Sequence, residues 1–241
     1  MKLKHLLTGL FILALYSASF GQARAFRDFI IAANSLTNPK AGQNVFQSNG
    51  GLERFELEKW GTGWAISRGD ELIKEGYSFN FDYQKNDLYV RNDKEDMTVV
   101  VDTNSVRRFV IFNGIDSLLF VKNISIDPTN KVFFQVVGGN TNGKVALLKL
   151  RLAHEIPINK NDYARNFSGD YTIHYRSEVE YYIVDRDKGI KSYPNLSRKE
   201  LLSLYPEYSD LISRYLQNNK KADDATLGMI FNGINGSGNG S

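Results

Sequence analysis

The nine residues GYSFNFDYQ, at positions 76–84, restrict the possible folds of this chain more than any other stretch. Aromatic and polar side chains alternate in it without interruption. The aromatic positions are Tyr77, Phe79, Phe81 and Tyr83, and the polar positions are Ser78, Asn80, Asp82 and Gln84. Because successive side chains of a strand point to opposite faces, the pattern predicts a β-strand with one apolar face and one face in water.

Other short apolar segments lie on both sides of this strand. In chain order they are KWGTGWAIS, DLYVRN, MTVVVD, VRRFVIF, SLLFV, VFFQVVG, KVALLKLRL, GDYTIHYR and VEYYIVD. Turn residues such as Asn113-Gly114 and Asn142-Gly143 separate them. Many short strands joined by tight turns favour an antiparallel meander, sandwich or open barrel, which we place at residues 57–190. No stretch long enough for a crossover helix lies between the strands, so we do not expect a parallel sheet.

The pattern becomes helical in residues 191–233. Ser197 and Glu200 have the spacing of a capping box, in which each side chain bonds the backbone amide of the other residue at the start of a helix. Pro206 interrupts or restarts the helix. Residues 207–216 then place their apolar side chains on one helical stripe. We therefore expect short amphipathic helices that depend on packing against the rest of the protein.

Three smaller segments complete the domain plan. Residues 22–56 predict a short helix followed by a loop rich in Asn and Gly. Asp223 or Asp224 can cap a last helix, and residues 234–241 predict a flexible tail. The fold class expected for the whole chain is mainly β, with a small C-terminal helical segment in an α+β arrangement.

The first 21 residues have the layout of a secretory signal peptide. Lys2 and Lys4 give a basic start, eleven apolar residues follow, and small residues precede Gln22. A membrane-spanning helix needs about 20 apolar residues, so this run is too short, and the mature chain is expected to have no transmembrane span. We predict export with cleavage between Gly21 and Gln22. Cleavage after Ala25 and an uncleaved anchor are the alternatives.

Composition and charge exclude several classes of function. The sequence has no cysteine, which excludes disulfides, thiolate catalysis and Cys-ligated zinc. Removal of the signal peptide takes away Lys2 and Lys4, so the formal net charge falls from +3 to +1, with 28 basic and 27 acidic residues. A nucleic-acid footprint needs clustered Lys and Arg, so we expect no nucleic-acid partner.

Five segments carry a resemblance to a known group of proteins. They are YYIVDRDKGIK, LSRKELLSLYPEYSDLISRYLQNNK, DATLGMIFN, GYSFNFDYQKNDLYV and FFQVVGGNTNGKVALLKLRL. Over roughly residues 55–233 the chain resembles uncharacterised exported proteins of the Bacteroidota type, which have a β-rich body and a short helical C-terminus. The resemblance implies an envelope or secreted location, and it lends no catalytic residue and no activity.

The sequence contains none of the common catalytic or metal-binding motifs. His154-Glu155 begins like the zinc motif H-E-x-x-H, but the second His is missing and Pro157 would break the helix. Asp185 and Asp187 match the first two ligand positions of an EF-hand loop, but the glycine and the final acid are missing, which favours a hairpin tip. We therefore predict no metal and no cofactor, and we lean toward a chain without enzymatic activity.

A pair of acids is the remaining route to catalysis. A glycosidase needs two carboxylates that face each other about 5–9.5 Å apart, one of them with a raised pKa. The candidate acids are Glu53, Glu56, Glu58, Asp82, Glu178 and Glu180. A solvated sheet face produces the same pattern, and we favour that interpretation.

Aromatic residues are the main candidates for ligand binding. Curved antiparallel sheets can enclose an apolar molecule, and Trp and Tyr combine a large apolar face with a polar group. The candidates are Trp60, Trp64, Tyr77, Phe79, Phe81 and Tyr83, with Arg107 and its neighbour Arg108 at the rim. In the competing interpretation the rings form the core and Arg107 lies at a solvated strand edge.

These patterns lead to three hypotheses about function. The first is a non-catalytic secreted or periplasmic module that binds an envelope protein, a lipid or a glycan through its aromatic-rich sheet. The second is a glycosidase-like hydrolase that uses a carboxylate pair. The third is a role in assembly, which predicts an exposed apolar stripe on residues 207–216. The missing catalytic motifs favour the first and the third.

Overall fold

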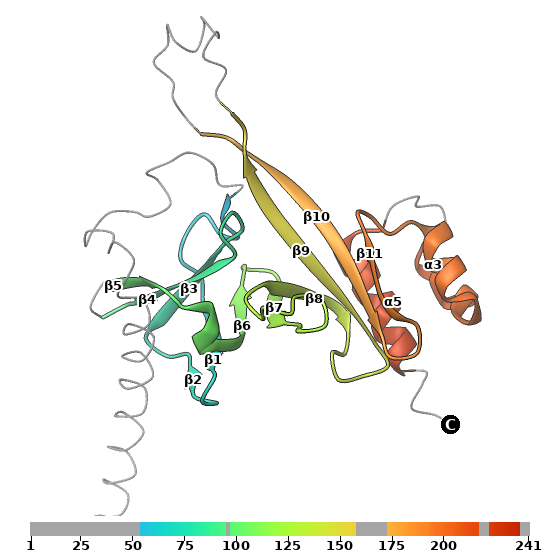
Figure 1. Ribbon diagram of the computed structural model, residues 1–241, viewed down its shortest axis with the longest axis horizontal. Coiled ribbons are helices and arrows are strands. Elements are labelled where there is room, and N and C mark those ends of the chain that lie inside the picture. The colour runs from blue at the N-terminus through green and yellow to red at the C-terminus, as the bar shows by residue number, and fades with distance from the viewer. Residues whose placement is uncertain (1–53, 95–96, 158–172, 217–221, 237–241) are drawn as a thin grey trace, which may run out of the picture. The chain divides into compact units, whose positions relative to one another are not determined.

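The computed structural model of the protein describes residues 54–94, 97–157, 173–216 and 222–236 (Figure 1). The chain divides into two compact units, one up to Ser117 and one from Leu118 onward. Within each unit the paired strands run antiparallel, and the α-helices follow the strands at the C-terminal end. The predicted fold class, mainly β with a small helical segment, is confirmed.

The helices and strands follow one another through the described residues. They are β1 (Gly63–Ser67), β2 (Leu72–Ile73), β3 (Tyr77–Asp82), β4 (Asp87–Asn92), β5 (Met97–Val100), η2 (Thr103–Ser105), β6 (Val106–Phe112), β7 (Ser117–Lys122), β8 (Phe133–Gly139), β9 (Val145–Glu155), β10 (Tyr175–Asp185), β11 (Gly189–Tyr193), α3 (Arg198–Leu204), η3 (Pro206–Tyr208), α4 (Ser209–Tyr215) and α5 (Asp224–Gly236).

The predictions for the N-terminus fall on residues that the structure does not describe. The signal peptide lies outside the described residues, and of the predicted segment 22–56 only residues 54–56 lie inside them. None of the helices found in the described ranges combines the length and the apolar character that a membrane span requires.

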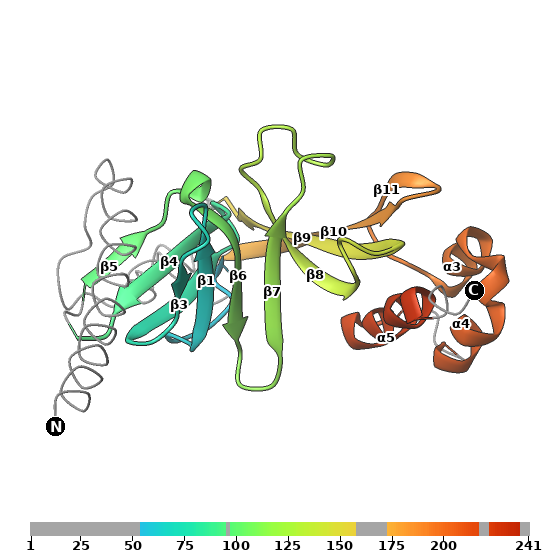
Figure 2. The same ribbon diagram turned by 90° about the horizontal axis from the view of Figure 1, so that it is seen from below.

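The strands in the described part of the first unit belong to two sheets. One has the strand order β3-β4-β5, which Figure 2 shows side by side, and the other contains β6-β1-β2. Residues 54–61, which we name the edge segment, extend the first sheet beyond β3. The Glu56 amide donates to the Phe81 carbonyl of β3 at 3.0 Å, and the Gly61 amide donates to the Phe79 carbonyl of β3 at the same distance. The chain then continues into β1, so one stretch joins the two sheets.

Small residues line the inner side of this connection. Gly61 pairs with the buried Phe79, and Gly61, Gly63 and Ala65 alternate with larger residues. A methyl group on Gly63 would collide with the carbonyl of Val110 and lie 3.2 Å from the ring of Phe79. The alternate, outward positions are Trp60, Thr62, Trp64 and Ile66. The chain can bend from one sheet into the other because its inward positions lack bulk.

Apolar side chains from both sheets form the core of the first unit. The rings of Phe81 and Phe109 have centroids 5.3 Å apart. Ala65, the neighbour of Phe109 across the strands, is fully buried. Phe79, Phe81 and Tyr83 are all at most 2% exposed. The apolar face predicted for residues 76–84 therefore packs in the core, as the alternation indicates.

The second unit contains an antiparallel meander. Its strands lie in the order of the sequence, β7-β8-β9-β10-β11. β9 and β10 form its longest ribbon, paired from Glu155 opposite Tyr175 to Val145 opposite Asp185 (Figure 1). This part of the fold is the meander that the short strands and tight turns predict.

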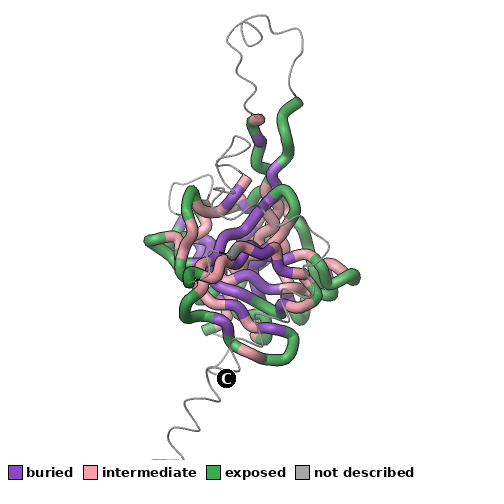
Figure 3. Tube along the Cα trace, turned by 90° about the vertical axis from the view of Figure 1, so that its left-hand side faces the viewer, coloured by how far each residue is buried: buried purple, intermediate pink, exposed green. Residues whose placement is uncertain are grey.

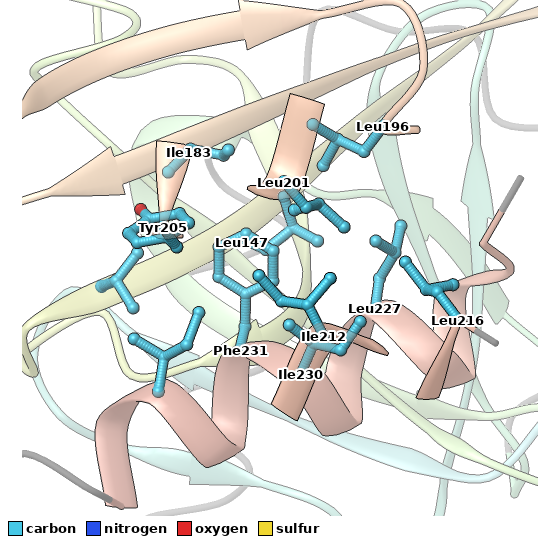
Figure 4. Close-up of a cluster of buried hydrophobic side chains, with 12 residues drawn as sticks. Leu147, Ile183, Leu196, Leu201, Tyr205, Ile212, Leu216, Leu227, Ile230 and Phe231 are labelled. Atoms are coloured by element: carbon cyan, nitrogen blue, oxygen red, sulfur yellow. The ribbon is translucent and has the colours of Figure 1, made fainter. Parts of the chain in front are cut away.

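The C-terminal helices cover one face of this meander. Figure 4 shows side chains from β9, β10, α3, α4 and α5 converging on one cluster. Its members are Val145, Leu147, Ile183, Leu196, Leu201, Tyr205, Ile212, Leu216, Leu227, Ile230, Phe231 and Ile234. Ile212 and Leu216 belong to the predicted helical stripe, and both are fully buried. The stripe therefore packs on the helical cluster, and of its residues only Tyr215 is among the exposed large apolar side chains.

The helix ends confirm the predicted caps. The Ser197 hydroxyl accepts from the Glu200 amide at 3.3 Å, and the Glu200 carboxylate accepts from the Ser197 amide at 2.7 Å. Asp223 accepts from the Thr226 amide at 2.8 Å, which caps α5. These local side-chain bonds satisfy amides that the first turn of a helix leaves without partners.

Some elements differ from the sequence-based expectation. GDYTIHYR and VEYYIVD predict two strands, but Tyr175 and Arg176 from the first segment and all of the second belong to one strand, β10. β2 and β11 were not predicted, because β2 has two residues and four of the five residues of β11 are exposed. α5 continues through Ile234 to Gly236, into the stretch expected to be a tail, because Ile234 is buried in the helical cluster.

α5 approaches β8 closely at two glycines. A methyl group on Gly138 would lie 2.6 Å from the Cα of Gly228, and one on Gly228 would lie 2.7 Å from the carbonyl oxygen of Val137. The Asn235 side chain strengthens this contact, since its Oδ1 accepts from the Lys144 amide at 3.0 Å. The helix can pack at this distance only because neither glycine carries a side chain.

We expect Gly228→Ala to destabilise the second unit by about 1–3 kcal/mol, because the methyl group would press on the β8 backbone. Inside a free helix the same change would stabilise by about 1 kcal/mol. Urea unfolding followed by circular dichroism at 222 nm would measure the change. Gly236→Ala is the matched control, since a methyl group there meets nothing within 4 Å. Equal stability of the two variants would contradict the close contact.

Candidate functional site

The predicted ligand-binding rings of the first unit lie in two environments. Phe79, Phe81 and Tyr83 are in the core, and Figure 3 shows how burial concentrates along the strands while the turns are exposed. Trp60, Trp64 and Tyr77 are half-buried. A fully buried ring offers no surface to a ligand. Ligand binding therefore stays a prediction only for the three half-buried rings.

The expectation that the polar side of residues 76–84 faces water is wrong for its two central residues. Asn80 and Asp82 are both 0% exposed, because the edge segment pairs with β3 beside them. The Asn80 amide fills a gap in this pairing: its Oδ1 accepts from the Leu57 amide at 3.1 Å, and its Nδ2 donates to the Leu57 carbonyl at 2.8 Å. A side chain here replaces backbone bonds that a regular strand would make.

Asp82 holds the start of the edge segment. Its Oδ2 accepts from Nε of Arg54 at 2.8 Å and also from Nη2 of the same side chain. Its Oδ1 accepts from the amides of Gln84 at 2.9 Å and Lys85 at 3.3 Å. These bonds occupy both carboxylate oxygens, so Asp82 serves the structure and has no oxygen left for chemistry.

A second carboxyl group, that of Asp87, lies opposite Asp82 in the β3–β4 ladder. Burial, and then the charge of Asp82, raise the pKa of Asp87 from its ordinary 3.8 to about 6, although Lys85 and Arg54 act in the other direction. Burial is also the main reason that the pKa of Tyr89 rises to about 12. Asp87 can therefore exchange a proton near neutral pH, but its neighbour is already ion-paired.

The other candidate acids do not form a facing pair. Three are engaged with side chains near them, Glu56 with Tyr83, Glu178 with His154 and Glu180 with Tyr182. Glu58 is exposed, and Glu53 lies outside the described residues. The geometry thus brings together Asp82 and Asp87 alone, and one of these two is fully committed to Arg54.

Trp64 belongs to a different kind of surface, the outward side of β2-β1-β6. The cross-strand register places three rows of side chains there, about 6.7 Å apart along the strands. The first row is Leu72, Ile66 and Arg108, the second is Trp64 and Val110, and the third is Thr62 and Phe112. We name these seven residues the Trp64 face. Leu72 is 53% exposed and Phe112 is 42% exposed, so large apolar side chains face water, whereas Val110 is buried at 9% exposure.

Arg108 supplies the charge of the Trp64 face. Its guanidinium lies over the Trp64 ring, 6.0 Å from the centroid, in a cation–π contact. No carboxylate in the described part of the chain lies within ion-pairing distance of Arg108. Its neighbour Arg107 differs, because it is the extra residue of a β-bulge and pairs with Asp70 in the β1–β2 turn. The predicted rim residue, Arg107, is thus exposed and paired.

Trp60 lies on the outward side of the other sheet. Arg91 stacks over its ring at 5.2 Å, and Arg91 pairs with Asp93 at 3.3 Å. Trp60 and Trp64 both occupy outward positions of the alternating pattern, but the chain passes from one sheet into the other between them. Their surroundings therefore differ: the cation over Trp60 has an acidic partner, whereas the cation over Trp64 has none among the described residues.

Of the Trp64 face, the sequence reasoning named Trp64 and, within the Arg107-Arg108 pair, Arg108; it missed the other residues. A signal was present in WGTGWAI, where glycine and alanine occupy the inward positions and Trp, Thr, Trp and Ile the outward ones. In VRRFVIF, the alternation likewise puts Arg108, Val110 and Phe112 on one side. In this stretch the small residues point inward and the aromatic residues outward, the reverse of the arrangement in residues 76–84.

At the predicted hairpin tip, the Asp185 carboxylate accepts hydrogen bonds from groups of the same chain. Asp185 accepts from the Tyr205 hydroxyl at 2.8 Å and from the amides of Asp187 at 2.9 Å and Lys188 at 3.0 Å. Burial alone would raise the pKa of Asp185, but these hydrogen bonds outweigh it and lower the pKa below its ordinary value. Across the described ranges, no cluster of three or more His, Asp or Glu side chains could hold a metal ion.

Comparison with known proteins adds no relative: no family model, no curated protein and no solved structure matches the chain. The site must therefore be interpreted from its own residues. The Trp64 face and the Asp82–Asp87 pair are the two arrangements in the first unit that go beyond ordinary packing.

We expect Asp87→Asn to stabilise the first unit at pH 7.5 by about 1–2 kcal/mol. Between pH 3.8 and about 6 the folded protein holds a proton that the unfolded chain has released, so the free energy of unfolding falls as pH rises and stays low above pH 6. Partial exposure keeps the gain below the full linkage value. Trp fluorescence follows this unit, because both tryptophans belong to it. Asp116→Asn, at an exposed turn position, should change nothing, and an unchanged pH profile in Asp87→Asn would contradict the raised pKa.

Arg54→Met should destabilise the same unit by about 3 kcal/mol, because it leaves the buried Asp82 carboxylate without its cation. The double variant Arg54→Met with Asp82→Asn removes the charge as well, and should recover at least part of the loss. Urea unfolding monitored by Trp fluorescence measures both. An ordinary surface change alters the free energy of unfolding by less than about 0.5 kcal/mol. A loss that small in the single variant would show that the ion pair does not hold the edge segment.

Proposed function

We propose that the chain is an exported, non-catalytic binding module that recognises a partner protein through the Trp64 face. One observation carries the proposal: a sheet turns Trp64, Leu72 and Phe112 outward in adjacent rows, with Arg108 stacked on the tryptophan. Contiguous apolar side chains on a surface mark interaction sites. Trp and Arg are also the residue types that contribute most to binding energy in protein interfaces.

The chemistry of the face favours a protein over a glycan or a lipid surface. Sugar sites combine aromatic rings with several convergent polar groups, whereas the face has only Thr62 and Arg108 as polar side chains. Lipid-surface recognition relies on clusters of Lys and Arg, whereas Arg107 beside the face is paired with Asp70. An apolar face with one cation matches the composition of a protein interface core.

The hydrolase alternative has less support from the geometry. It requires one carboxylate as acid and another as base or nucleophile. Asp87 has the raised pKa of an acid, but Asp82 uses both oxygens for Arg54 and two backbone amides. Export is proposed on the sequence alone, from the layout of the first 21 residues.

Site-specific photo-crosslinking in the native cells tests the proposal. A photoreactive residue at Thr62, an exposed position within the face, should form a protein adduct, and the same residue at Lys94, in the turn after β4, should not. Trp64→Ala should lower the adduct yield at least tenfold, because it removes the centre of the face. Trp60→Ala, the matched change on the other sheet, should leave the yield within twofold.

Three outcomes would contradict the proposal. These are an adduct at Thr62 that persists in the Trp64→Ala variant, an adduct whose mass identifies a lipid or a glycan, and the absence of any adduct at Thr62. Circular dichroism of each variant must match the parent chain, so that a lost adduct reports lost contact and not lost folding.

A further inference from the structure

We infer that the partner presents to the Trp64 face an extended peptide segment with a carboxylate two positions away from an apolar side chain. The inference rests on the proposed function and names the chemistry of the ligand. It starts from Arg108, whose charge is unmatched by any acid in the described residues, and from the row spacing of the face.

The first step concerns the charge. Asp70 lies in the turn beside the face, but it is already paired with Arg107. The guanidinium of Arg108 therefore stacks on Trp64 without an acidic partner among the described residues. A planar guanidinium binds a carboxylate through two parallel hydrogen bonds, and it does so more strongly when apolar groups around it exclude water. Leu72, Ile66 and Trp64 provide that apolar surrounding, and the ligand has to provide the carboxylate.

The second step concerns the spacing. The rows of the face repeat about every 6.7 Å, which is the distance between residues i and i+2 of an extended chain. A peptide lying flat along the strands would place alternate side chains on successive rows. Its carboxylate would meet Arg108 in the first row, an apolar side chain would meet Trp64 in the second, and another would meet Phe112 in the third.

The number of cations on the face favours a carboxylate over a phosphate as the group that binds Arg108. A phosphoryl group carries nearly two negative charges and three acceptor oxygens, so its sites gather several cations or amides. The face has a single available cation, because the adjacent Arg107 is engaged with Asp70. One charge is therefore the better match, and a phosphopeptide becomes an alternative that the experiment must detect.

The test is selection from a random twelve-residue peptide display library on the full chain. We expect enrichment of peptides with Asp or Glu two positions from a large apolar residue. For a synthetic peptide from that pool, Arg108→Glu should weaken binding at least tenfold, as should replacing the peptide acid by its amide. Changing that acid to Lys should restore part of the binding to the Arg108→Glu variant. Arg176→Glu, the same charge change on an exposed residue of the second unit, should leave binding within twofold.

The outcomes separate this inference from the proposed function. The inference would be overturned, and the proposed function kept, by one result: enriched peptides lack an acid, bind the Arg108→Glu variant as well as the parent chain, and fail to bind the Trp64→Ala variant. Binding that survives Trp64→Ala would overturn both. A library without enriched sequences, or a peptide that binds tightly only when phosphorylated, would overturn the inference.

Discussion

The pairing of the edge segment with β3 is the interaction on which the first unit depends. It buries two polar side chains that the strand pattern alone would leave in water, Asn80 and Asp82. Both are satisfied by the edge segment, Asn80 by the backbone of Leu57 and Asp82 by Arg54. An unpaired buried polar group costs about 1–3 kcal/mol, and a charged one more, so the segment can cover these two side chains only because it also supplies their partners.

The same pairing decides where the tryptophans point. Gly61 is fixed against Phe79, and the alternation continues through Gly63 and Ala65 on the inner side. Trp60 and Trp64 must then lie on the outer side, one on each sheet. An interior that is filled by phenylalanines from β3 and β6 leaves no room for them. The exposed aromatic surface of this protein thus follows from the way its core is closed, and the proposed binding role follows from that surface.

Local patterns in the sequence predicted local structure well. β4 and β6 have the bounds expected from DLYVRN and VRRFVIF, and the capping box at Ser197 forms as its spacing indicates. The failures concern contacts between distant residues. Asp82 meets Arg54 across 28 positions, and nothing in the alternation of residues 76–84 announces that a second strand will cover its polar side. Most of the Trp64 face was missed for a related reason, since burial of an aromatic residue depends on which side of the strand the core occupies. The local signs were the alternation in WGTGWAI and in VRRFVIF.

Hydrogen exchange of individual amides in the full chain tests the central claim most directly, because the edge segment is held to β3 by named backbone bonds. The amides of Glu56, Gly61, Phe79 and Tyr83 all donate to carbonyls across this pairing. We expect them to exchange together, at least a hundredfold more slowly than the exposed amide of Gly69. Exchange of Glu56 and Gly61 at the rate of Gly69 would show that the segment is not paired, and the outward direction of Trp64 would lose its physical basis.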